Sequence, residues 1–280
     1  MPTFPASAPV PVVVDVPFGN LHVVAGDRDD VVVTVLPADP AKSGSVRAAE
    51  ETRVGRDGDA VTIVYPASWK QYVLPFAAGG ARVTVELPAG SSLTGKAGSL
   101  YAEGRLGVVD LTLNGGEARI DEAARVDLKV SAGSVTIGRV TGPAVVRATA
   151  GAVRITELAG DGTVRCTNAT TTVGSVTGSL DVSGAHGDVV VGRVRGSLTA
   201  KAASGGIRVD RVDSGTVRLT TSYGGIEVGV PEGTAAWLDV ASQHGAVRNL
   251  LQPTEGPVDD EATAEIHAST GYGDVVVRRP

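Results

Sequence analysis

The chain has 280 residues, of which 42% are hydrophobic and 4% aromatic, and 31 Asp and Glu outnumber 25 Lys and Arg to give a net charge of −6. No run of about 20 apolar residues occurs, so no transmembrane segment is expected. No cluster of Lys or Arg stands out along the chain, so nucleic acid and anionic membranes are not expected as partners.

The start of the chain and its cysteine content bear on the compartment. Residues 1–14 contain no Lys or Arg, whereas a secretory signal begins with a positively charged region. Cys166 is the single cysteine, so no intrachain disulfide can form. With Met1 taken as the true start, we expect a cytoplasmic protein.

The first 65 residues predict several strands around a charged insertion. Alternating apolar residues indicate strands at Val10–Val16, Leu21–Val24 and Val31–Val35. The charged residues 42–56 predict one short helix or a loop. A further strand follows at Val61–Tyr65.

Residues 66–80 concentrate the rare aromatic side chains, because Trp69, Tyr72 and Phe76 lie within eight residues of one another. One interpretation is a binding loop whose rings stack on a sugar or on a partner's side chain. The other is a bulky cap over an open end or flank of the fold. The cap is the interpretation that we favour, and both remain open at this point.

From Gly98 to Gly233, glycine recurs at a spacing close to nine residues, with a short Val-rich run between successive glycines. Such self-similarity is typical of repeat proteins. In runs such as Val135, Ile137 and Val140, alternation predicts a strand with one buried face. Two runs make one coil of 18 residues, and stacked coils predict an all-β, single-stranded parallel β-solenoid.

We expect one solenoid domain over residues 1–280. Its three parts are the strands, insertion and aromatic loop of residues 1–80, the regular coils of residues 81–250, and a closing region, residues 251–280. That closing region begins with an acidic loop from Gln252 to Glu261 and continues with strands at Ala264–Ala268 and Asp274–Val277.

Three segments carry a family resemblance: Phe18-Gly19-Asn20 between two strands, Val83–Ser91, and Thr270–Val275 near the end. With the recurring Ser/Tyr-Gly-x-Val steps, the chain resembles a bacterial β-strand-repeat family, domain of unknown function 4097, also called putative adhesin or toast-rack domains. The resemblance covers most of the chain. It implies a right-handed β-helix with no catalytic signature.

Equivalent positions of successive coils stack, so the residue before each turn glycine predicts a polar and aromatic ridge. In sequence order this ridge consists of Ala132, Ala150, His186, Ser204, Tyr223, His244 and Tyr272. We take His186, Tyr223, His244 and Tyr272 as candidate partner-binding residues, beside Trp69, Tyr72 and Phe76. His186 and His244 are expected about three rungs, or roughly 14 Å, apart, which is too far for one shared zinc ion.

The same stacking argument predicts a charge ladder of Arg208, Glu227 and Arg248 in adjacent coils. Glu227 between two cations should be ionised, so it is a poor general acid for a glycosidase, which also needs a second carboxylate nearby. No catalytic residue, cofactor or metal site is assigned, and we expect a protein that is not an enzyme.

Two hypotheses of function follow. The first is a non-enzymatic, adhesin-like interaction or scaffold module for an unknown protein or glycan. The second is a structural protein whose coils stack end to end, as in bactofilins by architecture. A polysaccharide-acting enzyme is the third and weakest hypothesis.

Overall fold

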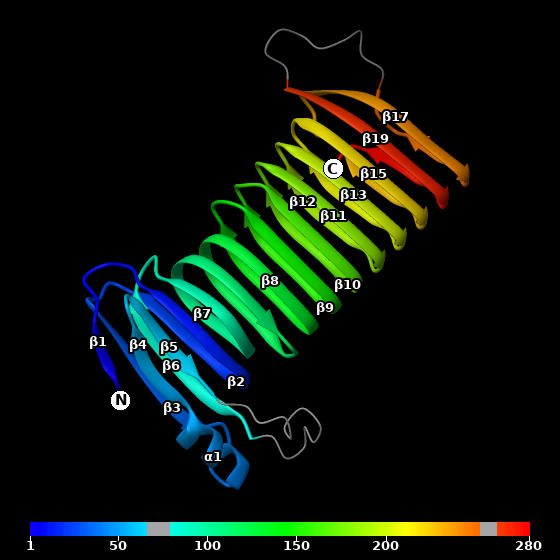
Figure 1. Cartoon of the computed structure of the whole chain (residues 1–280). Coiled ribbons are helices and arrows are strands. Elements are labelled where there is room, and N and C mark those ends of the chain that lie inside the picture. The colour runs from blue at the N-terminus through cyan, green and yellow to red at the C-terminus, as the bar shows by residue number, and fades with distance from the viewer. Residues whose placement is uncertain (66–78, 253–261) are drawn as a thin grey trace. The chain divides into compact units, whose positions relative to one another are not determined.

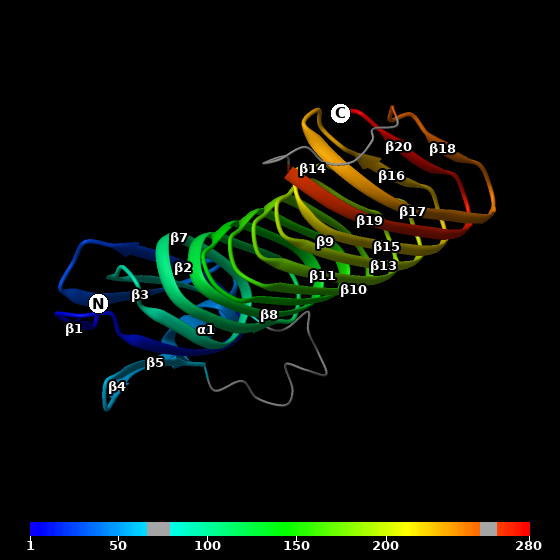
Figure 2. The same cartoon turned by 90° about the horizontal axis from the view of Figure 1, so that it is seen from above.

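The computed structural model describes residues 1–65, 79–252 and 262–280 (Figure 1). The chain divides into two compact units, Met1–Thr141 and Gly142–Pro280. In each unit β-strands wind around an apolar core, as the view from above shows (Figure 2). The predicted all-β parallel β-solenoid is confirmed. The single domain over residues 1–280 stays a prediction.

Unit 1 contains one helix and eight strands among its described residues. They are β1 (Thr3–Pro5), β2 (Pro11–Gly26), β3 (Asp30–Pro37), α1 (Ser43–Glu51), β4 (Arg53–Asp57), β5 (Ala60–Val64), β6 (Ala81–Pro88), β7 (Ser92–Leu113) and β8 (Glu117–Val140). The charged insertion therefore forms α1, followed by β4. The two strands predicted at Val10–Val16 and Leu21–Val24 are one strand, β2, whose register with β7 shifts between Val16 and Asn20.

The strand β2 lies inside unit 1, although it comes early in the sequence. On one side it pairs in parallel with β5 and β6, and on the other with β7. The next coil follows in parallel from β7 to β8. The side chains that these strands turn inward, such as Val12, Leu21 and Leu93, are at most 1% exposed. The parallel stack therefore begins at β5 and β6, not at β2.

Antiparallel strands cover the outer edge of β5 and β6. The strand β3 pairs antiparallel with β6, β4 pairs antiparallel with β5, and β1 pairs antiparallel with β3. The helix α1 contacts β3 and β6. The pairing satisfies backbone groups that an edge strand would otherwise expose.

Unit 2 consists of strands alone within residues 142–252 and 262–280. They are β9 (Ala144–Leu158), β10 (Gly162–Val176), β11 (Ser179–His186), β12 (Val189–Val194), β13 (Ser197–Ser204), β14 (Ile207–Val212), β15 (Gly215–Tyr223), β16 (Ile226–Gly229), β17 (Thr234–His244), β18 (Val247–Asn249), β19 (Ala262–Tyr272) and β20 (Val275–Arg278).

The strands of unit 2 pair in parallel with the 18-residue register that the glycine spacing predicts. Val146, Val164, Val182 and Ala200 are successive partners in β9, β10, β11 and β13. All four are nearly fully buried. The core is thus a column of small aliphatic side chains, each stacked on its equivalent in the next coil.

The last two coils do not follow the order of the sequence. The strand β19 lies between β15 and β17, and β20 lies between β16 and β18. Among the described residues, β17 and β18 have no other strand partners, so they form the outer edge of unit 2. The expected sequential stacking is wrong at this edge, because nothing in an 18-residue period requires neighbouring coils to be consecutive.

Glycine and hydroxyl residues hold the corner where the ridge lies. Gly224 has a φ of +151°, and a Cβ there would lie 2.1 Å from the carbonyl oxygen of Gly205, so only glycine fits. The Thr221 hydroxyl donates to the Gly205 carbonyl at 3.0 Å, and the Thr270 hydroxyl donates to the Gly224 carbonyl at 2.8 Å. Each coil is thereby attached to the turn of its neighbour.

Candidate binding site

The corner described above carries the predicted ridge on unit 2. The strand pairings place His186 beside Ser204, Ser204 beside Tyr223, Tyr223 beside Tyr272, and Tyr272 beside His244. Each of these residues ends its strand, directly before a turn glycine. Because parallel strands in register lie roughly 4.8 Å apart, equivalent side chains are carried past one another at stacking distance.

Three of the predicted site residues form a continuous aromatic stack. The ring centroids of Tyr223 and Tyr272 are 5.0 Å apart with an interplanar angle of 4°, and those of His244 and Tyr272 are 4.4 Å apart with an angle of 18°. Tyr223 is 59% exposed and Tyr272 50% exposed. Tyr272 has rings on both faces, whereas the other face of Tyr223 is turned to the rung of Ser204, which has no ring.

A groove lies on each side of this stack. One, of about 370 Å³, is lined by residues of β15, β17 and β19, including Thr220, Gln243 and Ser269. The other, of about 400 Å³, lies over β12, β14, β16 and β20 and presents Asp188, Arg208, Glu227 and Asp274. The stack therefore stands as a partition between a hydroxyl-lined and a charged groove.

The insertion of β19 changes two predictions made from sequence order. His186 and His244 are four rungs apart, not three, because Tyr272 lies before His244 in the stack. Arg208 and Glu227 are neighbours, with 3.8 Å between Nη1 and Oε2, but Val276 separates Glu227 from Arg248. The second cation beside Glu227 is instead Arg278.

Trp69, Tyr72 and Phe76 lie outside the described residues, so the binding-loop and cap interpretations both stay predictions. Within the described residues, no group of three or more His, Cys, Asp and Glu is placed to hold a metal ion. Cys166 is buried, as its place in the alternation predicted, and burial raises the pKa of its thiol.

A histidine between two carboxylates on the outer coils was missed by the sequence reasoning. His267 Nε2 lies 2.8 Å from Glu265 Oε1, and Nδ1 lies 3.2 Å from Asp239 Oδ2, while Trp237 packs edge-on to the ring at 5.1 Å. The hydrogen bonds to Glu265 and to Asp239 raise the pKa of His267 above its ordinary value of 6.5. His267 comes next to Asp239 only because β19 pairs with β17.

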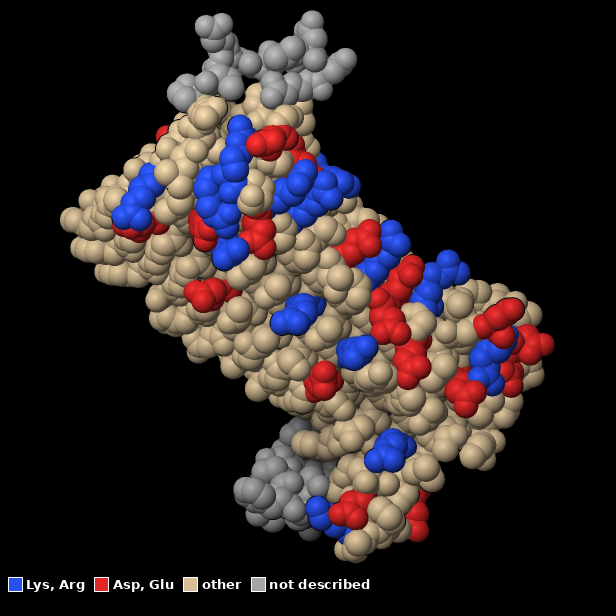
Figure 3. Space-filling model, turned by 180° about the vertical axis from the view of Figure 1, so that it is seen from behind, with Lys and Arg blue, Asp and Glu red and all other residues tan. Residues whose placement is uncertain are grey.

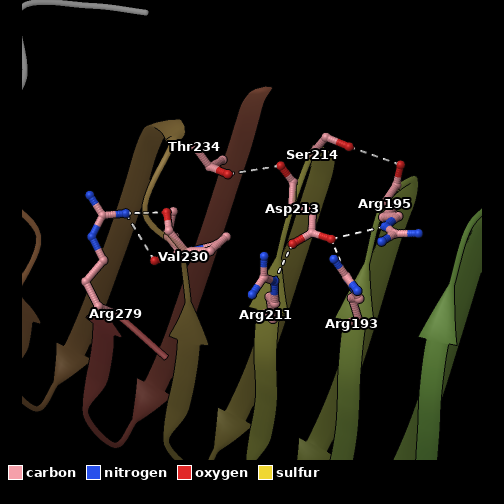
Figure 4. Close-up of polar contacts among 9 residues, drawn as sticks. Arg193, Arg195, Arg211, Asp213, Ser214, Val230, Thr234 and Arg279 are labelled. Atoms are coloured by element: carbon pink, nitrogen blue, oxygen red, sulfur yellow. Dashed lines mark hydrogen bonds and ion pairs between the residues drawn. The ribbon is translucent and has the colours of Figure 1, made fainter. Parts of the chain in front are cut away.

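A cluster of arginines at the far end of β12 and β14 was also missed (Figure 4). Asp213 accepts from the Nε of Arg193, of Arg195 at 3.1 Å, and of Arg211 at 2.5 Å. Burial alone would raise the pKa of the Asp213 carboxyl, but these hydrogen bonds outweigh it and hold that pKa at about 2. The expectation that Lys and Arg form no cluster is therefore wrong in space, although it describes the linear sequence.

The family can be stated at this point. A family model described as Toastrack DUF4097 matches residues 14–278. The chain belongs to this family. The match spans both units, so β2 and β20 are parts of one Toastrack repeat pattern. The resemblance seen in the sequence at Phe18-Gly19-Asn20, Val83–Ser91 and Thr270–Val275 is confirmed.

Solved structures similar to this Toastrack chain include two putative adhesins. One is from Bacteroides fragilis, with 10% identity, coverage of 99% of this chain and 95% of that one, and a TM-score of 0.34. The other is from Parabacteroides distasonis, with 15% identity, the same coverage and a TM-score of 0.36. A putative cell adhesion protein from Clostridium sporogenes has 11% identity, coverage of 99% and 94%, and a TM-score of 0.18. Among curated proteins, no significant match was found.

The described part of the Toastrack chain contains no helix that is long and apolar enough to cross a membrane.

Proposed function

We propose that this Toastrack chain is a non-enzymatic, adhesin-like interaction module that contacts its partner through the aromatic stack of Tyr223, Tyr272 and His244. The observation that carries the proposal is the stack itself. It exposes two tyrosines on a rigid corner between two grooves. Rigid aromatic side chains supply contact area at little cost in conformational entropy, which is why they are enriched at binding surfaces.

The stack also restricts how a ligand is held. Because both faces of Tyr272 are covered, a ligand ring stacks on the face of Tyr223 turned toward Ser204. The tyrosine hydroxyls and the hydroxyl-lined groove then provide hydrogen bonds. This combination suits a glycan, which offers an apolar ring face and a rim of hydroxyl groups, and a protein side chain is the alternative partner.

The test measures binding to a glycan array with wild type, Tyr223→Ala and Ser204→Tyr. The first variant removes the stacking face. The second adds a ring in register and covers that face without shortening the stack. We expect both to lose the glycans that wild type retains, while Tyr101→Ala, which removes an exposed tyrosine from unit 1, keeps them. Equal binding by wild type and Ser204→Tyr would contradict the proposed mode of contact.

Self-association is a second candidate, supported by the outer edge of unit 2. Within the described residues β17 pairs with β19 alone and β18 with β20 alone. Trp237 is 57% exposed and Leu250 63% exposed on this coil. An unpaired strand edge with exposed apolar side chains is a template for pairing with another chain. A second copy of the coil would be its partner.

Light scattering at increasing concentration tests this candidate. Wild type should form larger species, whereas Leu250→Lys, which places a charge at the edge, should stay a monomer with unchanged unfolding behaviour. A single monomeric species of wild type at high concentration would rule out the candidate. Cytoplasmic localisation stays a prediction, which cell fractionation would test.

A further inference from the structure

We propose that four arginines of unit 2 form a binding track for an acidic polysaccharide. The arginine track consists of Arg193, Arg195, Arg211 and Arg279. It lies at the finishing ends of β12, β14 and β20, whereas the aromatic stack lies before the starting ends of β12 and β14. The inference goes beyond the proposed function, because it assigns a different site and a class of ligand.

The solenoid register arranges these arginines in a row. Arg193 and Arg211 are direct partners in β12 and β14, so their backbones are one rung, roughly 4.8 Å, apart. The chain then passes from Val230, the next coil's residue, to Arg279, whose Nη1 donates to the Val230 carbonyl at 3.1 Å and to the Pro231 carbonyl. Figure 4 shows Arg279 on the far side of Val230 from Arg211.

The cluster keeps a net positive charge after its internal pairs are counted. Three guanidinium groups share the single carboxylate of Asp213, and Arg279 is bonded to backbone carbonyls. Glu232, exposed directly after Pro231, is the second carboxylate at this corner. Four cations therefore stand against two anions. On the face drawn in Figure 3, Lys and Arg side chains also gather over unit 2 with fewer acidic ones between them.

Asp213 holds the arginines in a binding-competent arrangement. Its side chain is 16% exposed, and both carboxylate oxygens accept from Nε atoms, Oδ2 from Arg193 and Arg195 and Oδ1 from Arg211. Each guanidinium has further N–H donors on its Nη atoms, and all three side chains are roughly half exposed. Two hydroxyls fix the backbone here, with Ser214 donating to the Arg195 carbonyl and Thr234 to that of Asp213.

The row favours a polymer over a small anion. One exposed ion pair contributes about 0–1 kcal/mol, so a lone carboxylate or sulfate binds weakly. A chain with an anionic group on successive sugars engages several guanidiniums at once and gains from effective concentration. A pyranose unit spans a length close to one rung, so the repeat of the polymer can follow that of the solenoid.

A single-stranded nucleic acid fits the track less well. Proteins that bind such strands combine a basic groove with aromatic rings on which the bases stack. No residue labelled in Figure 4 is aromatic, and the net charge of the chain is −6. Carboxylate or sulfate groups on a sugar chain need only the paired N–H donors of Arg, which match their geometry.

The experiment measures fluorescence anisotropy of labelled oligogalacturonate and of labelled dextran sulfate at low salt. One arm supplies carboxylates and the other sulfates. We expect longer oligogalacturonates to bind more tightly, and Arg193→Ala/Arg211→Ala to lose about tenfold in affinity for the preferred polymer. Arg193→Lys/Arg211→Lys should bind at an intermediate level, because lysine keeps the charge without the paired donors.

The matched control is Arg165→Ala/Lys201→Ala, which removes two exposed cations from β10 and β13 and so gives the same net charge. It should bind as wild type. Arg279→Ala removes a track cation without touching Asp213, so its expected loss does not depend on that cluster staying folded. Thermal unfolding of each variant checks the fold.

Three results would overturn the proposal: no binding of either polymer, equal losses in the control and the track variants, or tighter binding of a single-stranded oligonucleotide than of both polymers. Tyr223→Ala separates this site from the proposed function. It should leave polymer binding by the track unchanged, whatever it does to binding at the aromatic stack.

Discussion

The outer edge of unit 1 and the outer edge of unit 2 are finished in different ways. In unit 1 the antiparallel strands β3 and β4 pair with β6 and β5, and α1 packs against β3 and β6. In unit 2 the outer coil of β17 and β18 has no strand beyond it within the described residues. Side chains near the covered edge, such as Leu87, are fully buried, whereas Leu238 on β17 is half-buried.

The difference shows what a solenoid coil requires from its neighbours. A coil buries its apolar side chains against the coils on both sides, so a coil with one neighbour keeps part of that surface exposed. Unit 1 solves this with strands of opposite direction. Unit 2 relies on contacts along the outer coil itself, notably His244 stacked on Tyr272 and His267 paired with Asp239.

The largest effect is expected from the same truncation made at both edges. Leu87→Ala should lower the free energy of unfolding by about 3–5 kcal/mol, because it leaves a cavity in a fully packed core. Leu238→Ala should cost about 1 kcal/mol, since part of this side chain is already in water. Urea denaturation measures both. Equal losses would show that the outer coil is as well covered as the inner ones.

A smaller effect is expected from removing rings of the aromatic stack. Tyr272→Ala should cost about 1–3 kcal/mol because it removes two ring contacts at about 0.5–1.5 kcal/mol each, and His244→Ala should cost about half as much. The same denaturation measurement applies, with near-ultraviolet circular dichroism reporting the tyrosine environment. If His244→Ala cost as much as Tyr272→Ala, the outer coil would depend on its histidine for more than stacking.

The smallest effect is expected from pH, and at the edge of unit 2 alone. His267 has a raised pKa in the folded chain, so its stabilising contribution is complete below about pH 6.5 and is lost as the pH rises through that raised value. Amide hydrogen exchange in β17 should accelerate over this range. Arg28, paired with Asp30 and Glu86 near the edge of unit 1, stays charged, so β6 should not respond.

The control for the pH experiment is His267→Gln, which keeps a polar side chain without a titrating ring. Exchange in β17 of this variant should follow only the ordinary dependence of amide exchange on pH. An identical acceleration in wild type and His267→Gln would show that the ion pair with Asp239 does not hold the outer coil.

Much of this fold can be predicted from the sequence because its repeats are local. The glycine spacing and the alternation in runs such as Val189–Val194 lead directly to the 18-residue coil and its inward side chains. The position of β19 cannot be found in this way, because any coil of the right length pairs with any other. The predicted neighbours of Glu227 and the spacing of His186 and His244 were wrong for this single reason.

The aromatic stack was predicted as a ridge, but its order was not. The arginine track was missed although its signal is present, since Arg193 and Arg211 are 18 residues apart and each precedes the last buried valine of its strand. A search for charge along the chain overlooks such a pair, whereas a search at the period of the coil would find it. Asp213, two residues after Arg211, follows the same rule with Arg195.

The place of β19 between β15 and β17 also has a consequence for the order of synthesis. During translation β17 and β18 leave the ribosome before β19 and β20, and the coil on which they will rest does not yet exist. They either wait unpaired or dock provisionally on β15 and are then displaced. Folding of this edge is therefore a late and concerted step, in which two coils of the chain find their places together.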